Sequence, residues 1–228
     1  MSVETSETRL RVRAMRVFSP SRLAAYAIGV PVLSAGIVVT IRADLGVSPV
    51  NSVPFVLSQT SAWSLGVASF AIYGLQVALQ ALVLWRRTTW KVPLQLVGAF
   101  AFAWAIGTFD TVIPERTGSG WLTSAVLLAV GIALTALGTT LVIRSNLLVA
   151  PPDGVVQAVS IRTSWEFGIV KIVHDCAMVA IALVIGLIAG QAGVGIGVGT
   201  LISALLVGYA IRHFARGFDA LTGRNDPR

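Results

Sequence analysis

Apolar residues dominate six stretches of the chain, and short links rich in polar residues, glycine or proline separate them. We place the stretches at roughly residues 23–41, 65–85, 92–113, 121–142, 167–189 and 194–214. An α-helix of about 20 apolar residues is long enough to cross the hydrocarbon core of a bilayer. The pattern therefore predicts an all-α, polytopic membrane protein with six transmembrane helices.

Composition narrows the class further. Of the 228 residues, 55% are hydrophobic and only 12% are charged, and the mean hydropathy is +0.82. Soluble domains carry about 25% charged residues, so this composition excludes a disordered chain and most soluble enzymes. The single cysteine, Cys176, excludes a disulfide scaffold. The net charge of +7 lies mostly at the ends of apolar runs, which favours a membrane over a nucleic-acid partner.

Basic residues predict the orientation in the membrane. They concentrate in the N-terminal tail, in the links after the second and fourth spans, and at the C-terminus: Arg9, Arg11, Arg13, Arg16, Arg22, Arg86, Arg87, Lys91, Arg144, Arg162, Arg212, Arg216, Arg224 and Arg228. The other links contain only Arg42 and Arg116. By the positive-inside rule, both termini are cytoplasmic in a multi-pass protein of the bacterial plasma membrane. Residues 1–20 and 216–228 are then cytoplasmic polar tails, and 21–215 form one membrane domain.

The sequence contains an internal repeat. When it is shifted by 102 residues, Ile41–Pro49 aligns without a gap on Ile143–Pro151. The glycines align too: Gly29 and Gly36 fall on Gly131 and Gly138. More loosely, Gly98 and Gly107 resemble Gly199 and Gly208, which have the same separation. The repeats cover about 23–113 and 121–214. Each holds three spans, and an odd number forces the second copy to enter the membrane from the opposite side. Such inverted repeats are typical of secondary transporters, whose site lies at the repeat interface.

The links that follow the first span of each repeat, residues 42–63 and 144–165, are candidates for a site. Each begins with a polar residue, Asp44 or Asn146, and continues through proline to Asn51 or Asp153. Asn51 and Asp153 are placed like helix N-caps. Two interpretations are open. The links form re-entrant half-helices that aim their positive N-terminal ends at a ligand, or they form interfacial amphipathic helices that only connect spans.

The fifth span carries ionisable residues, which are rare inside a membrane and usually functional. Lys171 and Asp175 share a helix face, and His174 can exchange a proton near neutral pH. The repeat places Tyr73 at the position of Asp175. The alternative is that Lys171 extends to the nearby interface and Asp175 neutralises it.

Other polar features receive structural interpretations. We interpret Asp110 as an interfacial acid near Glu115 and Arg116, and the glycines at 193, 195, 197 and 199 as close-packing positions. The sequence shows no nucleophile–base pair and no metal-type His/Cys spacing. We therefore expect no enzyme activity, no catalytic residues, no cofactor and no metal.

These motifs resemble a known group. Leu45–Pro49, Pro151–Gly154, the Lys171/Asp175 pair and the glycine-rich Val194–Thr200 segment resemble the YczE/YyaS/YitT family of bacterial six-span membrane proteins, in particular its YczE branch. The resemblance covers about residues 20–215. The sequence departs from the family pattern at Pro152, where the family has arginine, and where Lys171 and Asp175 replace an Arg…Glu pair. The resemblance implies the six-span fold more than an activity.

The sequence supports one main functional hypothesis and two alternatives. The main hypothesis is a secondary transporter or permease in which Asp175, His174 and Lys171 handle substrate charge or a coupling proton. The alternatives are a substrate-capture subunit of an energised importer and a non-transporting membrane factor that assists a partner protein. Expected partners are the lipid bilayer and an unidentified small molecule or ion, with no nucleic acid; a homo-oligomer is possible.

Overall fold

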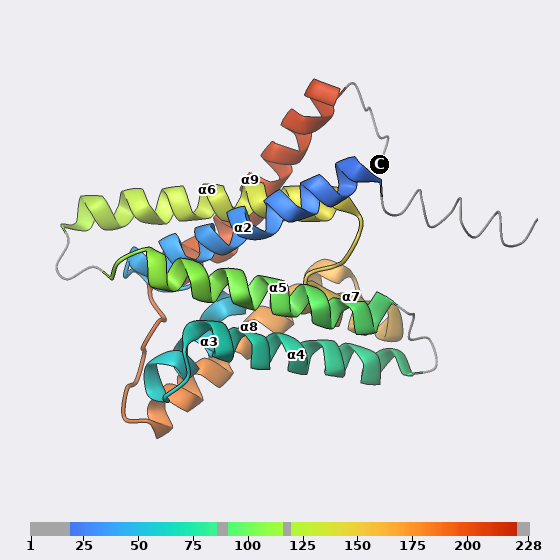
Figure 1. The fold of residues 1–228 in the computed structure, drawn as a ribbon. Coiled ribbons are helices and arrows are strands. Elements are labelled where there is room, and N and C mark those ends of the chain that lie inside the picture. Colours follow the sequence, from blue (N-terminus) through green and yellow to red (C-terminus); the bar gives the residue numbers. More distant parts are fainter. Residues whose placement is uncertain (1–18, 86–90, 116–119, 223–228) are drawn as a thin grey trace, which may run out of the picture.

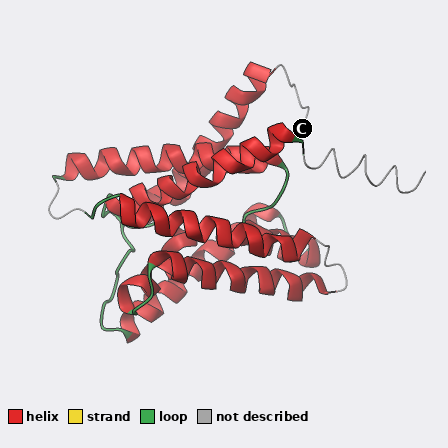
Figure 2. Ribbon diagram, in the orientation of Figure 1, coloured by secondary structure: helices red, strands yellow, loops and turns green. Residues whose placement is uncertain are grey.

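The computed structural model describes residues 19–85, 91–115 and 120–222, and their regular structure is entirely helical (Figure 2). Six of these helices are long and apolar enough to cross a membrane. They are α2 (Pro20–Arg42), α4 (Leu65–Leu84), α5 (Lys91–Val112), α6 (Trp121–Ser145), α8 (Phe167–Ile188) and α9 (Val198–Thr222). They confirm the predicted spans. Several of the basic residues used to predict orientation, among them Arg86, Arg87 and Arg116, lie outside the described residues.

The last helix differs from its prediction at both ends. It begins at Val198 and not near residue 194, because the preceding segment turns through glycines with left-handed backbone, including Gly193 (φ 81°) and Gly195 (φ 73°). Left-handed backbone is readily available to glycine. These two glycines therefore form the turn into α9. Gly195 is also a close-packing position, as predicted, because a Cβ on it would overlap the ring of Phe55, whereas a Cβ on Gly193 would meet nothing within 4 Å. At its other end α9 continues to Thr222, so residues 216–222 are helical where a polar tail was predicted.

The centre of the molecule is the contact between α2 and α6, which lie side by side (Figure 1). Two glycines allow the helices to approach. A Cβ atom on Gly36 would overlap the backbone nitrogen of Thr135, and one on Gly138 would overlap the backbone nitrogen of Leu33. Small residues let helix backbones meet closely in membranes, where packing and not hydrophobic exclusion holds helices together.

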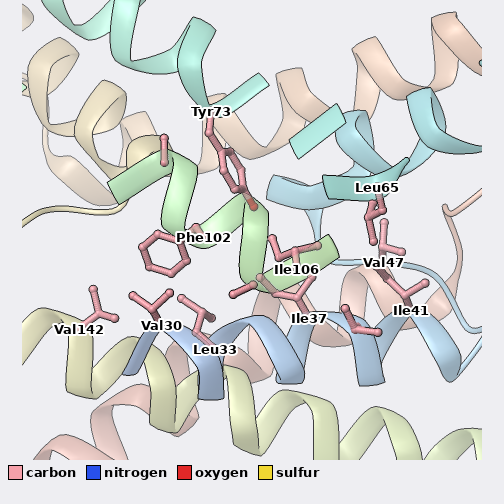
Figure 3. Packing of buried hydrophobic residues seen from close by; sticks show 13 residues of the cluster. Val30, Leu33, Ile37, Ile41, Val47, Leu65, Tyr73, Phe102, Ile106 and Val142 are labelled. Atoms are coloured by element: carbon pink, nitrogen blue, oxygen red, sulfur yellow. The ribbon is translucent and has the colours of Figure 1, made fainter. Parts of the chain in front are cut away.

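Around this central pair, α5 packs on α2 and α4, and α9 packs on α6. Figure 3 shows Phe102 and Ile106 of α5 above the row formed by Leu33 and Ile37 of α2. By contrast, many large apolar side chains of α8 and α9 are exposed, as expected for helices that face lipid.

Two short helices complete the fold: α3 (Pro49–Thr60) and α7 (Pro151–Thr163). Each packs against both α4 and α8. The N-caps are Ser48 and Ala150, so the prediction that Asn51 and Asp153 are N-caps is wrong. The cause is proline, whose fixed φ suits the first helical position and starts each helix earlier. Asn51 lies in the first turn instead, where its Nδ2 donates to the Ser48 hydroxyl at 2.8 Å.

An arginine at the C-terminal end of each central helix forms hydrogen bonds to a neighbouring helix or to the residues that follow it. Arg42, at the end of α2, donates to the backbone oxygens of Asp110 and Ile113 and to the Asp110 carboxylate at 2.9 Å. Arg144, at the end of α6, binds the carbonyl of Ala215 and the carboxylate of Asp219. Asp110 is therefore the partner of Arg42, a contact that the sequence did not predict; Arg116, which we expected near Asp110, lies outside the described residues.

We predict that Arg42→Met lowers the free energy of unfolding. The Arg42 side chain is only 8% exposed, and its loss leaves the Asp110 carboxylate and two carbonyls without their donor. Hydrogen bonds that involve a charged group contribute about 1.5–3 kcal/mol, and we expect a loss of that size. Thermal unfolding of the detergent-solubilised protein measures it. Arg212→Met, at an exposed arginine, is the control and should have little effect; equal melting temperatures for both variants would contradict the prediction.

Candidate functional site

Charged side chains from α7 and α8 meet in one cluster. Lys171 of α8 lies 2.8 Å from the Asp175 carboxylate, one turn further along the same helix. Its Nζ also lies 3.8 Å from the carboxylate of Asp153, in the first turn of α7. All three side chains are partly exposed, between 21% and 32%. One ammonium therefore faces two carboxylates, and α7 and α8 both contribute.

His174 extends the cluster toward α4. Its Nδ1 lies 3.2 Å from the Asp175 carboxylate, and its Nε2 lies 3.4 Å from Nε2 of Gln76. A carboxylate can only accept, so Nδ1 donates to Asp175 in the neutral ring, and Nε2 then accepts from the Gln76 amide. Gln76 Nε2 also lies 3.8 Å from the sulfur of Met178. In this arrangement the Gln76 amide nitrogen contacts both His174 and Met178, and Gln76 Oε1 contacts neither of them through a hydrogen bond.

Two glutamines of α4 bring unused acceptors to the cluster. Gln76 and Gln80 are one turn apart on the same helix face and are only 4% and 5% exposed. The Oε1 atoms of both are buried without a hydrogen-bond partner among the described residues. The Gln80 amide lies against Gly154, where a Cβ would overlap Oε1, and Gly154 is the neighbour of Asp153. The two glutamine side chains therefore contact His174 and the neighbour of Asp153, respectively.

A second polar group lies one turn from Gln76. The hydroxyl of Tyr73, on α4, donates to Oδ1 of Asn51 at 2.7 Å, and both residues are buried. Asn51 and Ser48 also line a small cavity between α2, α6 and α9. Ser203 of α9 lines the same cavity, and its buried hydroxyl has no partner among the described residues.

The structure thus assembles most of the predicted site residues. Lys171, His174, Asp175 and Asp153 form the charged cluster, and Asn51 and Tyr73 form the neighbouring pair. Asp44 and Asn146 lie apart from both groups, on exposed turns with left-handed backbone (φ 55° and 50°) where α2 and α6 end. Asn and Asp tolerate that conformation better than other non-glycine residues, so they terminate helices here.

Sequence reasoning missed Gln80, Ser48 and Ser203. The signal for Gln80 was present, because it follows Gln76 by four residues in an otherwise apolar span. A helix places such residues on one face. No comparable pattern marks Ser48 or Ser203, whose common cavity depends on how α3 and α9 pack.

With this geometry described, comparison with known proteins identifies the family. Residues 20–216 match the model of a family of unknown function, DUF6198. The chain belongs to this family. It is also 26% identical over 190 residues to the uncharacterized membrane protein YczE of Bacillus subtilis (strain 168), a match that covers 82% of each chain. The predicted resemblance is thereby confirmed, and the chain is a multi-pass integral membrane protein. No solved structure matches it.

Proposed function

We propose that the protein is a secondary transporter or permease for a small solute, built from two inverted repeats around the cluster of Lys171, His174, Asp175 and Asp153. The observation that carries this proposal is the cluster itself. Ionisable side chains in a membrane domain are costly to bury and usually mark a substrate or proton pathway. Here they come from different helices and lie near glutamine acceptors that have no partner among the described residues, a combination that a simple connection between spans does not require.

Pairs of contacts related by the repeat support the inverted architecture. Gly36 of α2 contacts Thr135 of α6. In the repeat alignment Gly36 corresponds to Gly138, and Thr135 corresponds to Leu33. Gly138 and Leu33 are also in contact. The short helices follow the same rule, since α3 packs on α8 and α7 packs on α4. Each repeat contains three spans, so the pseudo-two-fold axis that relates them lies in the membrane plane.

The cluster lies beside this axis. Gln76 and Met178 occupy equivalent positions in the two repeats, and their side chains touch. Two equivalent atoms can only be neighbours close to the axis that exchanges them. Gln76 also contacts His174, which supports a site at the repeat interface, the usual place for substrate in inverted-repeat transporters.

The short helices fit a re-entrant arrangement better than an interfacial one. The first turn of α3 reaches the middle of α4, through the bond between Asn51 and Tyr73. Buried residues are concentrated near this N-terminal end, and its last residues, Gln59 and Thr60, are partly or fully exposed. Because helix N-termini carry partial positive charge, a half-helix placed this way aims that charge at the interior of the bundle.

One difference between the repeats supports alternating access. In the first repeat, α4 and α5 meet through glycines: a Cβ on Gly66 would lie 3.0 Å from Cα of Gly107. The equivalent glycines, Gly168 of α8 and Gly208 of α9, do not touch; nothing lies within 4 Å of a Cβ on Gly208. The second repeat thus has the same small residues without the contact, as expected if it closes in another state.

One member of the open pair, Gly168, lies near the charged cluster. Gly168 precedes Lys171 by one turn of α8, and α9 runs from its packed start at Gly199 away from α8 (Figure 1). The closed pair, Gly66 and Gly107, belongs to the opposite end of the bundle, because α4 and α8 are inverted copies. On the orientation predicted by the basic residues, the open side is cytoplasmic in the bacterial plasma membrane.

A cysteine pair tests this proposal. We predict that Gly168→Cys/Gly208→Cys, in a Cys176→Ser background, forms an intramolecular disulfide on oxidation when the second repeat closes. A disulfide needs Cα atoms within about 7 Å, a distance that the equivalent α4/α5 contact satisfies by close approach. Locking the pair should reduce solute uptake into liposomes at least about tenfold, and reduction should restore it.

The pair Gly74→Cys/Gly208→Cys is the matched control, because Gly74 is equally free of neighbours but is not the counterpart of Gly208. It should stay uncrosslinked within one chain. A Gly168/Gly208 disulfide found only between two chains would contradict alternating closure and indicate a homo-oligomer. No disulfide of either kind would also contradict it.

A further inference from the structure

We infer that the charged cluster binds a solute through an ammonium group, with the cationic N–H donors of the solute meeting Asp153, Gln76 Oε1 and Gln80 Oε1. This inference deepens the proposed function by naming the substrate class of the same site. It concerns binding, and it holds whether the chain transports the solute alone or captures it for a partner.

The charge balance favours a cation. Lys171 supplies one positive charge to the carboxylates of Asp175 and Asp153. His174 adds none in the tautomer that donates to Asp175 and accepts from Gln76. With both carboxylates ionised, the cluster carries one net negative charge, and Lys171 lies closer to Asp175, at 2.8 Å, than to Asp153, at 3.8 Å. Asp153 is the carboxylate left with the weaker partner.

The hydrogen-bonding groups favour N–H donors in particular. Gln76 Oε1 and Gln80 Oε1 are acceptors that no donor among the described residues satisfies, and both side chains are more than nine-tenths buried. A buried acceptor without a donor costs about 1–3 kcal/mol, a cost that a bound donor removes. A primary ammonium has three N–H donors, one for each of the two amide oxygens and one for the Asp153 carboxylate. Tetramethylammonium carries the same charge without any donor.

The cluster is also accessible from outside. Asp153 and Lys171 are 32% and 28% exposed, and they lie near the N-terminal ends of α7 and α8. The buried glutamines belong to α4, which packs on α7. Asp153 is therefore the acceptor that a solute reaches first.

Thermal-shift titration of the purified protein tests the inference. Ethylammonium chloride should raise the melting temperature in a saturable way, whereas tetramethylammonium chloride and sodium chloride at equal ionic strength should not. Asp153→Asn makes the cluster neutral and should weaken ethylammonium binding at least tenfold. Asp110→Asn removes a carboxylate outside the cluster and should leave binding unchanged, because Arg42 keeps its two carbonyl acceptors.

Lys171→Gln distinguishes binding of an ammonium group from binding of an anionic solute. If the site binds an ammonium group, removing the competing lysine should tighten ethylammonium binding about tenfold. If the lysine binds an anionic solute, the same change should abolish the shift caused by sodium acetate. An acetate response that depends on Lys171 would overturn the inference, and so would equal responses to ethylammonium and tetramethylammonium or no response to ethylammonium.

These results are independent of transport. Ethylammonium binding that requires Asp153, in a protein that moves no solute into liposomes, would support the ammonium site and reject the transporter. Uptake of anionic solutes alone, with no ammonium binding, would support the transporter and reject the ammonium site.

Discussion

Gly138→Ala should strongly destabilise the protein. The new Cβ would overlap the backbone nitrogen of Leu33 at the centre of the α2–α6 contact. No rotamer change relieves a clash with backbone, so the two helices must separate. Overpacking of this kind costs about 1–3 kcal/mol and occasionally more, and we expect at least the upper part of that range. The free energy of unfolding in detergent measures it.

Two comparisons make this result specific. Gly36→Ala, the repeat counterpart, should cost a similar amount, because its Cβ would overlap the Thr135 nitrogen. Gly74→Ala has no neighbour within 4 Å and should be neutral or stabilising by up to about 1 kcal/mol, the helix-propensity difference between the residues. If Gly138→Ala were as stable as Gly74→Ala, the described α2–α6 packing would be wrong.

Asp175→Asn should abolish most solute uptake by the reconstituted protein. The Asp175 carboxylate accepts from both Lys171 and His174, and asparagine keeps its shape but not its charge. Without that carboxylate, Lys171 has only Asp153 to pair with among the described residues, and Asp153 is the carboxylate that we propose binds the solute. We therefore expect uptake to fall at least about tenfold, with a loss of stability no larger than that of a charge-assisted hydrogen bond, about 1.5–3 kcal/mol.

Asp110→Asn is the matched control, since it removes the same charge from a position outside the cluster. It should leave uptake within about twofold of the unchanged protein. Uptake that survives both Asp175→Asn and Asp153→Asn would remove the cluster from the transport pathway, whatever else the protein does.

The sequence predicted the spans well because their signal is local. A run of about 20 apolar residues is sufficient for a membrane helix, and α2, α4 and α5 lie within a few residues of their predicted bounds. The last span was less accurate. Its start depends on the turn formed by Gly193 and Gly195, and its continuation to Thr222 includes charged residues that hydropathy alone assigns to a tail.

The site was partly predictable for the same reason. Lys171, His174 and Asp175 share one helix, so their proximity follows from helical spacing. That Asp153 joins them depends on the packing of α7 against α8, which no local pattern encodes. Asp44 and Asn146 were selected because they repeat, but the repeated feature is the left-handed end of a helix. A residue that repeats in both halves can therefore have a structural role, such as ending a helix, and not a functional one.

Solute uptake by the purified chain alone, in sealed liposomes, tests the transporter proposal most directly. A panel of labelled cationic, zwitterionic and anionic solutes is compared in vesicles with the unchanged protein, with Asp175→Asn and without protein. We predict that the unchanged protein admits at least one ammonium-bearing solute faster than empty vesicles, and that Asp175→Asn returns its rate to that of empty vesicles. Equal rates in all three preparations for every solute would contradict the proposal.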